Sequence, residues 1–179
     1  MYPDSPVLQR AVWQALRAAR DLTEEEAAHR ILRAYADAPP AEPPPSETVC
    51  YYHLRSAPRS PDFRESVLEQ GAAVSASFLP CTLILVFYGP DGEAWAHRVQ
   101  DFLPMDGPGS FRRILRAAGL YPVPSGPGPA VLYEERGKTF RKRTDLALSL
   151  RLLSNAARAA PAPVVSRAPE VSIHYAGKD

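Results

Sequence analysis

The 179-residue sequence predicts an α+β fold: a mainly antiparallel sheet with helices packed on one face, two N-terminal helices and a long C-terminal hairpin. Helical periodicity near the N-terminus is the first observation behind this expectation. The second is a series of apolar or alternating runs typical of strands, and the third is the gathering of most of the 20 prolines into three windows. Because proline cannot continue a helix or donate to a central ladder, these windows separate structured blocks.

We expect one domain, because a chain of this length with 45% hydrophobic residues can bury one sizeable core. The domain divides into N-terminal helices at 1–38, a proline-rich spacer at 39–47, an α+β core at 48–160 and a C-terminal arm with a short strand at 161–179.

The N-terminal block predicts two helices. Apolar residues recur at helical spacing over residues 6–20, with arginines on the opposite side. Thr23 and Glu26 then form a capping box, whose hydroxyl and carboxylate accept hydrogen bonds from the first free amides of a second helix. Pro39 and Pro40 would end that helix, and the prolines at 43–45 would extend the chain as a stiff spacer. The predicted buried face of the second helix comprises Ala28, Ile31, Leu32 and Tyr35.

The first half of the core predicts strands. Residues 48–54 hold valine, cysteine and tyrosines, which favour a half-buried pleated surface. Residues 63–70 and 73–78 alternate loosely, and Pro80 would interrupt the pattern at an edge or a bulge. Residues 83–88 form the most apolar stretch, which predicts a central strand covered on both faces.

Two helices are predicted between the strands. A turn at 89–92 leads into the first of them, which ends before Pro104. Ser110 is placed as the N-cap of a shorter helix, and Gly119 is a natural left-handed stop. The apolar stripe of the first helix comprises Trp95, Val99, Phe102 and Leu103.

A proline-rich and glycine-rich loop at 122–129 precedes the predicted hairpin. Its strands are 130–133 and 139–153, joined near Gly137, and residues 171–175 offer one more short strand. The long second strand alternates with period two. Its inward residues are Leu146, Leu148, Leu150 and Leu152.

The sequence holds no pattern that specifies chemistry. Neither a glycine-rich phosphate loop nor a nucleophile elbow occurs, and the four histidines lie in separate blocks without metal-ligand spacing. Cys50 and Cys81 read as buried thiols. We therefore expect no catalytic residue, no cofactor site and no metal site, and no enzyme activity. No apolar run is long enough for a membrane span, and no signal peptide is expected.

Charge is nearly balanced, with 21 Lys+Arg against 20 Asp+Glu, which disfavours a protein that coats nucleic acid. The cations still gather locally. One reading is contact with phosphates or with an acidic partner surface; the other is a solvated hairpin tip that its charges protect from edge-to-edge aggregation. The candidate contact residues are Arg112, Arg113 and Arg116 on the short helix, and Arg136, Lys138, Arg141, Lys142 and Arg143 on the hairpin.

Three short sequence segments, in this order, resemble segments of the tail terminator or neck proteins of tailed bacteriophages. The first runs from 31 to 40 and through the spacer to Val49 and the tyrosine pair at 51–52, like that family's helix end, proline segment and tyrosine-containing first strand. This chain has Ala36 and Asp37 where the family pattern has Gln-Asn.

The second segment is the apolar strand that ends at 87–89, followed by an alanine-containing helix, then a loop and a short helix that ends near Gly119. The third is 134–136 with the alternating strand 145–152, which is similar to the family's late segment, and a basic insertion lies between them at 137–143. The resemblance covers residues 6–175.

The resemblance implies a structural role without catalysis. Such proteins typically form a ring, usually of six subunits, that caps the tail tube, ends tail polymerisation and joins the tail to head-completion or connector proteins. DNA passes through the lumen of the ring. The expected location is the virion neck at the head–tail junction, after synthesis in the host bacterial cytoplasm and without a membrane partner. The sheet and the hairpin would form the subunit interfaces.

Two alternatives stay open from the sequence. One is another head–tail joining or tail-tube component, which would occupy a different position in the particle. The other is a nucleic-acid-binding module that uses the basic cluster at 136–143, which predicts steeply salt-dependent DNA binding.

Overall fold

Two long strands, β4 (Ala72–Tyr88) and β7 (Thr139–Arg158), form the centre of the fold. They pair antiparallel from Val74 opposite Arg158 to Tyr88 opposite Arg143. The structure is a computed structural model that describes residues 5–34, 45–56, 63–69, 72–123, 126–136 and 139–158. Within these ranges, the side chains of 56, 63–69, 72–77, 136, 139 and 154–158 are not described.

The expected α+β fold with a mainly antiparallel sheet is confirmed. The sheet has seven strands in the order β1-β2-β4-β7-β5, with β3 paired to β4 and β6 paired to β7. The β1–β2 pair is parallel and the other described pairs are antiparallel. The other elements are α1 (Pro6–Arg20), α2 (Glu24–Arg30), β1 (Ile31–Arg33), β2 (Val49–Ser56), β3 (Phe63–Glu69), α3 (Gly92–Phe102), α4 (Phe111–Ala117), β5 (Leu120–Pro122) and β6 (Ala130–Arg136).

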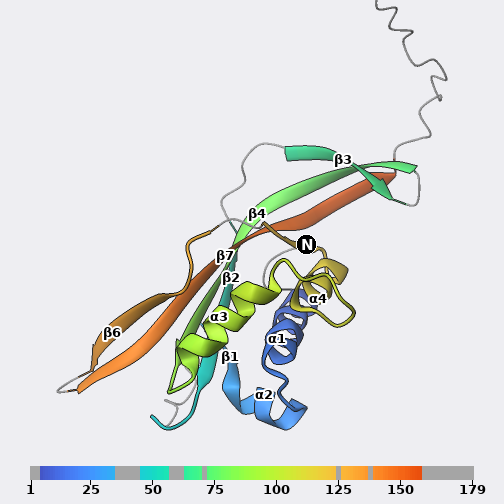
Figure 1. Ribbon diagram of the computed structural model, residues 1–179. Helices are drawn as coiled ribbons and strands as arrows, with labels where there is room; N and C mark the ends of the chain where they lie inside the picture. The colour runs from blue at the N-terminus through green and yellow to red at the C-terminus, as the bar shows by residue number, and fades with distance from the viewer. Residues whose placement is uncertain are drawn as a thin grey trace, which may run out of the picture.

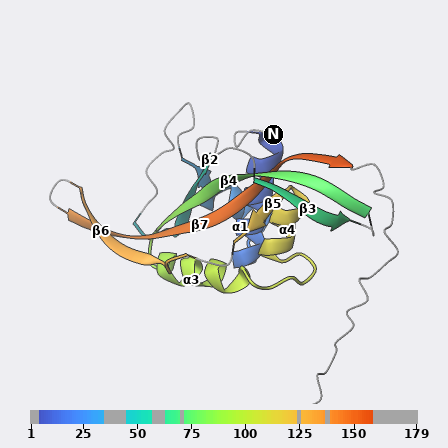
Figure 2. The ribbon, with the colours of Figure 1, turned by 90° about the horizontal axis from the view of Figure 1, so that it is seen from above.

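The ribbon formed by β4 and β7 is longer than the layer of helices. Figure 1 shows it extending past the helices at both ends, where β3 lies beside one end and β6 beside the other. The helices α1, α3 and α4 therefore cover only the middle of the sheet. Both ends of the sheet are left without a covering helix layer (Figure 2).

One face of the sheet carries the core. Leu83, Leu85 and Phe87 of β4 are fully buried together with α1 residues such as Leu16 and with Trp95 of α3. The predicted inward leucines of β7 are all buried in the same cluster, which confirms the period-two reading of this segment: Leu146, Leu148, Leu150 and Leu152. Burial of these side chains supplies most of the driving force for folding.

None of the helices in the described residues covers the second face of the sheet. Ile84 and Val86, which point to that face, are only half-buried. The prediction that residues 83–88 are covered on both faces is therefore wrong. An apolar run shows that a strand is central, and β4 does lie between β2 and β7, but it cannot show how many helix layers the chain supplies.

The second helix is shorter than predicted. Thr23 and Glu26 do form the capping box, with Thr23 N donating to Glu26 Oε2 over 2.9 Å. The helix ends at Arg30, and Ile31 begins β1, which pairs parallel with β2. Backbone pairing with β2 outweighs the helical pattern here, and Ala34 N donates to Tyr52 O over 2.9 Å.

The predicted buried face of this helix is accordingly wrong. Ala28 is exposed and Ala27 is buried in its place, while Ile31 and Leu32 belong to a strand. Tyr35, Pro39, Pro40 and the prolines at 43–44 lie outside the described residues, and so does the predicted strand at 171–175.

Pro80 does not interrupt β4. It lies opposite Arg151 of β7 within a continuous strand. On the other side, the pairs with β2 begin at Cys81 and those with β3 end at Phe78, so no described residue pairs with Pro80 along that edge. A missing N–H is tolerated at such a place. The irregularity in the ladder falls instead between Ser77 and Phe78.

The two later helices follow the prediction. Ser110 caps α4 by accepting a hydrogen bond from Arg113 N over 3.3 Å, and Gly119 has a left-handed φ of 83°. The predicted loop at 122–129 begins one residue later, because Pro122 closes the three-residue strand β5 on the edge of β7. Three residues are too few for a sequence pattern to reveal.

Candidate interaction surface

The β6–β7 hairpin projects from the body of the molecule. Residues 130–136 of β6 pair antiparallel with residues 139–145 of β7, and we call these two segments the hairpin arm. Figures 1 and 2 both show the arm extending away from α1 and α4. β6 is the outer strand of the arm, since among the described strands it pairs only with β7.

Large apolar side chains are exposed on the hairpin arm. Their exposed fractions are 38% for Val131, 41% for Leu132, 69% for Tyr133 and 72% for Phe140. Successive residues of a strand point to opposite faces, so β6 presents apolar groups on both faces at once. An exposed apolar edge strand of this kind pairs readily with another chain.

Sequence reasoning placed the strand but missed these four residues as an interaction surface. A signal was present, since the run Val131, Leu132 and Tyr133 does not alternate with polar residues. Such a run predicts either burial on both faces or contact with a partner. The choice between the two depends on whether helices reach the arm, which the sequence does not show.

Lys142 joins the hairpin arm to the helix layer. Its Nζ lies 2.6 Å from Glu93 Oε2 of α3. This hydrogen-bonded ion pair lowers the pKa of Glu93 and raises the pKa of Lys142. Both side chains are more than one third exposed, so solvent screens the pair and it contributes orientation more than stability.

Arg143, Arg141 and Tyr88 form a cluster on the uncovered face at the base of the arm. Arg143 lies 2.9 Å from Asp145, and the Arg141 guanidinium lies 4.6 Å from the centre of the Tyr88 ring. Tyr88 Oη donates to Glu134 Oε2 over 2.8 Å. Burial raises the pKa of Tyr88, and the hydrogen bond to Glu134 raises it further. The cluster ties β4, β6 and β7 together, which stiffens the base of the arm.

The eight cations predicted as contact residues do not form one patch. Arg112, Arg113 and Arg116 belong to α4, which lies apart from the arm in both views (Figures 1 and 2). Arg116 pairs with Asp106 over 3.1 Å. In the arm, the three cations with described side chains contact acidic or aromatic groups of the chain itself, as given above; the side chains of Arg136 and Lys138 lie outside the described residues.

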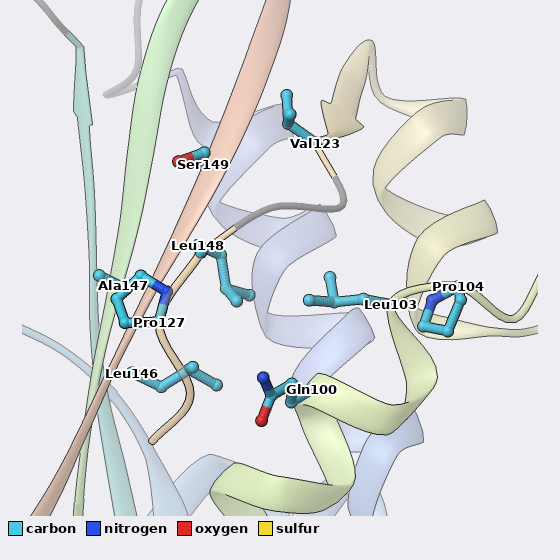
Figure 3. A pocket seen from close by; sticks show the side chains of 10 residues that line it. Gln100, Leu103, Pro104, Val123, Pro127, Leu146, Ala147, Leu148 and Ser149 are labelled. Carbon is cyan, nitrogen blue, oxygen red and sulfur yellow. The ribbon is translucent and has the colours of Figure 1, made fainter. Parts of the chain in front are cut away.

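A cavity of about 240 Å³ lies beside the arm, between the end of α3, the loop at 123–127 and the edge of β7. Figure 3 shows Gln100, Leu103 and Leu148 pointing into it. None of its ten lining residues is ionisable. The cavity therefore provides no acid or base for catalysis from its own walls.

Histidines and acids elsewhere in the described residues form no constellation. Within those residues, no group of three or more His, Cys, Asp or Glu side chains is placed to hold a metal ion. Burial raises the pKa of the Cys50 thiol well above its ordinary value and that of Cys81 to about 12. Neither thiol is a nucleophile near neutral pH in this fold.

None of the helices that the structure describes is long and apolar enough to cross a membrane. Comparison of the sequence with models of known protein families and with curated proteins gives no match.

Proposed function

We propose that this chain is a structural virion protein of a bacteriophage neck, which forms a ring, caps the tail tube and joins the tail to the head-completion or connector proteins. The observation that carries the proposal is the exposed apolar surface on both faces of β6. The proposal is supported by the three sequence segments between residues 6 and 175 that resemble tail terminators and follow one another in the same order.

The exposed apolar area of the arm favours association. Leaving such area in water costs about 25 cal/mol per Å², and a partner that covers it gains the part of this that exceeds the cost of lost translational and rotational freedom. The outer part of the arm extends past the helices (Figure 1), although Lys142 contacts Glu93 of α3, so another chain can reach the exposed apolar side chains. A protein whose function is to join other proteins needs such a surface.

A ring requires an interface between two different surfaces of the same chain that closes by rotation. The arm supplies one of these surfaces, at one edge of the sheet. Closed symmetry then leaves two opposite faces of the ring, one for the tail tube and one for the connector. A formal net charge of +1 suits a lumen through which DNA must move without being held.

DNA contact by the arm is not part of the proposal. Lys142 and Arg143 lie against carboxylates of the same chain, and Arg141 lies over an aromatic ring. Binding to phosphates would have to displace these contacts.

Sedimentation and electron microscopy of the purified chain, alone and with the tail-tube protein of the same genome, test the proposal. We expect closed rings in the chain alone and rings at one end of each tube in the mixture. A chain that stays monomeric at micromolar concentration and leaves tube ends bare would overturn it.

A further inference from the structure

The sheet has two opposite outer edges. Among the described strands, β1 is the last on one side, and β6 is the outer strand on the other side where the arm begins. In Figure 1, β6 lies on the far side of β7 and β1 lies beside α2 on the far side of β2. An association that joins different surfaces of one chain can bring these two edges together.

The two edges lie at the same level of the sheet. Following the ladder across, Ile31 pairs with Cys50, which pairs with Phe87, then Thr144, then Val131. The next row runs from Leu32 through Tyr51, Val86 and Asp145 to Ala130. A second copy placed beside the first in the same orientation therefore meets β6 with its own β1, with little shift along the strands.

The strand directions also fit. β1 is parallel to β2, while each of the steps from β2 to β4, from β4 to β7 and from β7 to β6 is antiparallel. β6 consequently runs antiparallel to β1. Copies in the same orientation would join these edges as an antiparallel pair, which is the more stable kind of ladder.

Charge favours the same contact. The sequence places Arg136 and Lys138 at the turn of the hairpin, whereas Arg141, Lys142 and Arg143 already contact acidic or aromatic groups of the same chain. On the other edge, the α2 helix that leads into β1 begins with Glu24, Glu25 and Glu26. In the described part of the chain, Glu24 and Glu25 form no ion pair, and Glu25 lines a surface hollow with Glu26, Glu47, His29 and Arg30, so that three acids and one arginine meet there.

We propose that β6 of one copy pairs antiparallel with β1 of the next copy, so that the sheets continue from subunit to subunit and α2 faces the basic tip of the neighbouring arm. The apolar groups of β6 are covered by that neighbour. The proposal rests on the proposed ring and specifies its subunit interface. The regular twist between neighbouring strands, about 20–25° per step, gives the rotation that lets such a chain of sheets curve.

A disulfide tests the register. Leu32 and Ala130 point to the same face and fall opposite each other in the proposed pair, where Cα atoms lie about 4.5–5.5 Å apart. That spacing permits a disulfide. The variant L32C/A130C should give a ladder of covalently linked multimers under mild oxidation, and a mixture of the two single variants should give linked dimers only. Native Cys50 and Cys81 are buried and stay out of the reaction.

The matched control is L32C/Y133C. Tyr133 is on the same outer strand, but it points to the opposite face and lies three residues from Ala130, so this variant should not link. Linking in the control as strongly as in the test pair would overturn the register. Rings that form without any linking of L32C/A130C would overturn the interface and leave the proposed function standing, whereas a persistent monomer would overturn both.

Charge reversal provides a second measurement that does not depend on β1 accepting a cysteine. E24K/E25K and R136E/K138E should each weaken association at least tenfold, and the four changes together should restore it. Unchanged association in both double variants, or failure of the combination to restore it, would contradict the proposed contact between α2 and the arm.

Discussion

Gly89 sets the turn between β4 and α3 through its backbone conformation. Its φ is +96°, and a Cβ there would meet the Glu47 carbonyl and lie 2.7 Å from Thr48 Cα. We expect Gly89→Ala to lower the free energy of unfolding by more than about 1 kcal/mol, since both the φ and the space exclude a side chain. Urea denaturation measures the change.

Gly109→Ala is the matched control for Gly89. Gly109 also has a positive φ, +71°, but a Cβ there would meet nothing within 4 Å. The Gly109→Ala substitution therefore costs only the conformational penalty of a left-handed alanine, about 1–2 kcal/mol, and the loss should be smaller than that of Gly89→Ala. Equal losses of unfolding free energy in the two variants would show that the close approach of residues 47 and 48 adds nothing to the cost of a side chain at Gly89.

Cys50 and Cys81 should not react with thiol reagents in the folded protein. Burial raises the pKa of Cys81 from 9.0 to about 12 and that of Cys50 well above 9.0, so the thiols stay protonated in the fold. At pH 8 we expect no reaction with a disulfide reagent before unfolding and two reactive thiols after it. Rapid labelling of the native chain would contradict the burial of these strands.

The raised pKa values of the two thiols make the stability of the fold depend on pH. Folding favours the neutral thiols, so their contribution to stability is complete below pH 9 and is lost as the pH rises from 9 toward the folded-state values. Melting temperatures recorded between pH 8 and pH 11 should fall more steeply for the native chain than for C50A/C81A.

At the scale of single elements, the capping box sets the start of α2. Thr23 Oγ1 accepts a hydrogen bond from Glu26 N over 3.2 Å. Thr23→Ala removes that acceptor and should lower the free energy of unfolding by about 1 kcal/mol, measured by urea denaturation. Thr23→Ser keeps a hydroxyl and should retain most of the stability; a loss as large as that of the alanine variant would argue against the cap.

Substitutions of exposed residues on the hairpin arm should weaken self-association without lowering the stability of the fold. Tyr133 and Phe140 are about 70% exposed, so Y133S/F140S should change the free energy of unfolding by less than about 0.5 kcal/mol. The same variant should weaken self-association at least tenfold in sedimentation. Met105→Ser, which removes an exposed apolar side chain in the loop after α3, is the control and should associate normally. Equal effects in both variants would mean that general hydrophobicity drives association.

Local signals account for the elements that the sequence predicted correctly. The capping box at Thr23, the cap at Ser110, the left-handed Gly119 and the alternating leucines of β7 each act within a few residues, so a pattern reveals them. The features that were missed depend on distant partners. β1 exists because β2 lies beside it, and β4 tolerates Pro80 because neither β2 nor β3 pairs with that residue on the edge opposite β7.

The candidate surface was predicted only in part, for the same reason. The basic residues of the hairpin were visible in the sequence, but three of them turned out to contact the chain's own Glu93, Asp145 and Tyr88. The exposure of the apolar residues of the arm depends on how far the helices extend along the sheet (Figure 1), which no local sequence pattern shows.

At the scale of the whole molecule, the sheet extends past its helices, and among the described strands β1 and β6 have no further partner on their outer sides. A domain that works alone protects such edges with charge, short strands or covering helices. Here one edge carries exposed apolar groups and the other follows an acidic helix, an arrangement suited to association of identical copies. The near-zero net charge leaves local complementarity, instead of overall attraction or repulsion, to control that association.

Gold-labelled antibody against the chain, viewed by electron microscopy on virions of the encoding phage, shows where the chain lies in the assembled particle. We expect label at the junction of head and tail, and at one end of free tails. Label along the tail, on the capsid or on no part of the virion would contradict the proposed function.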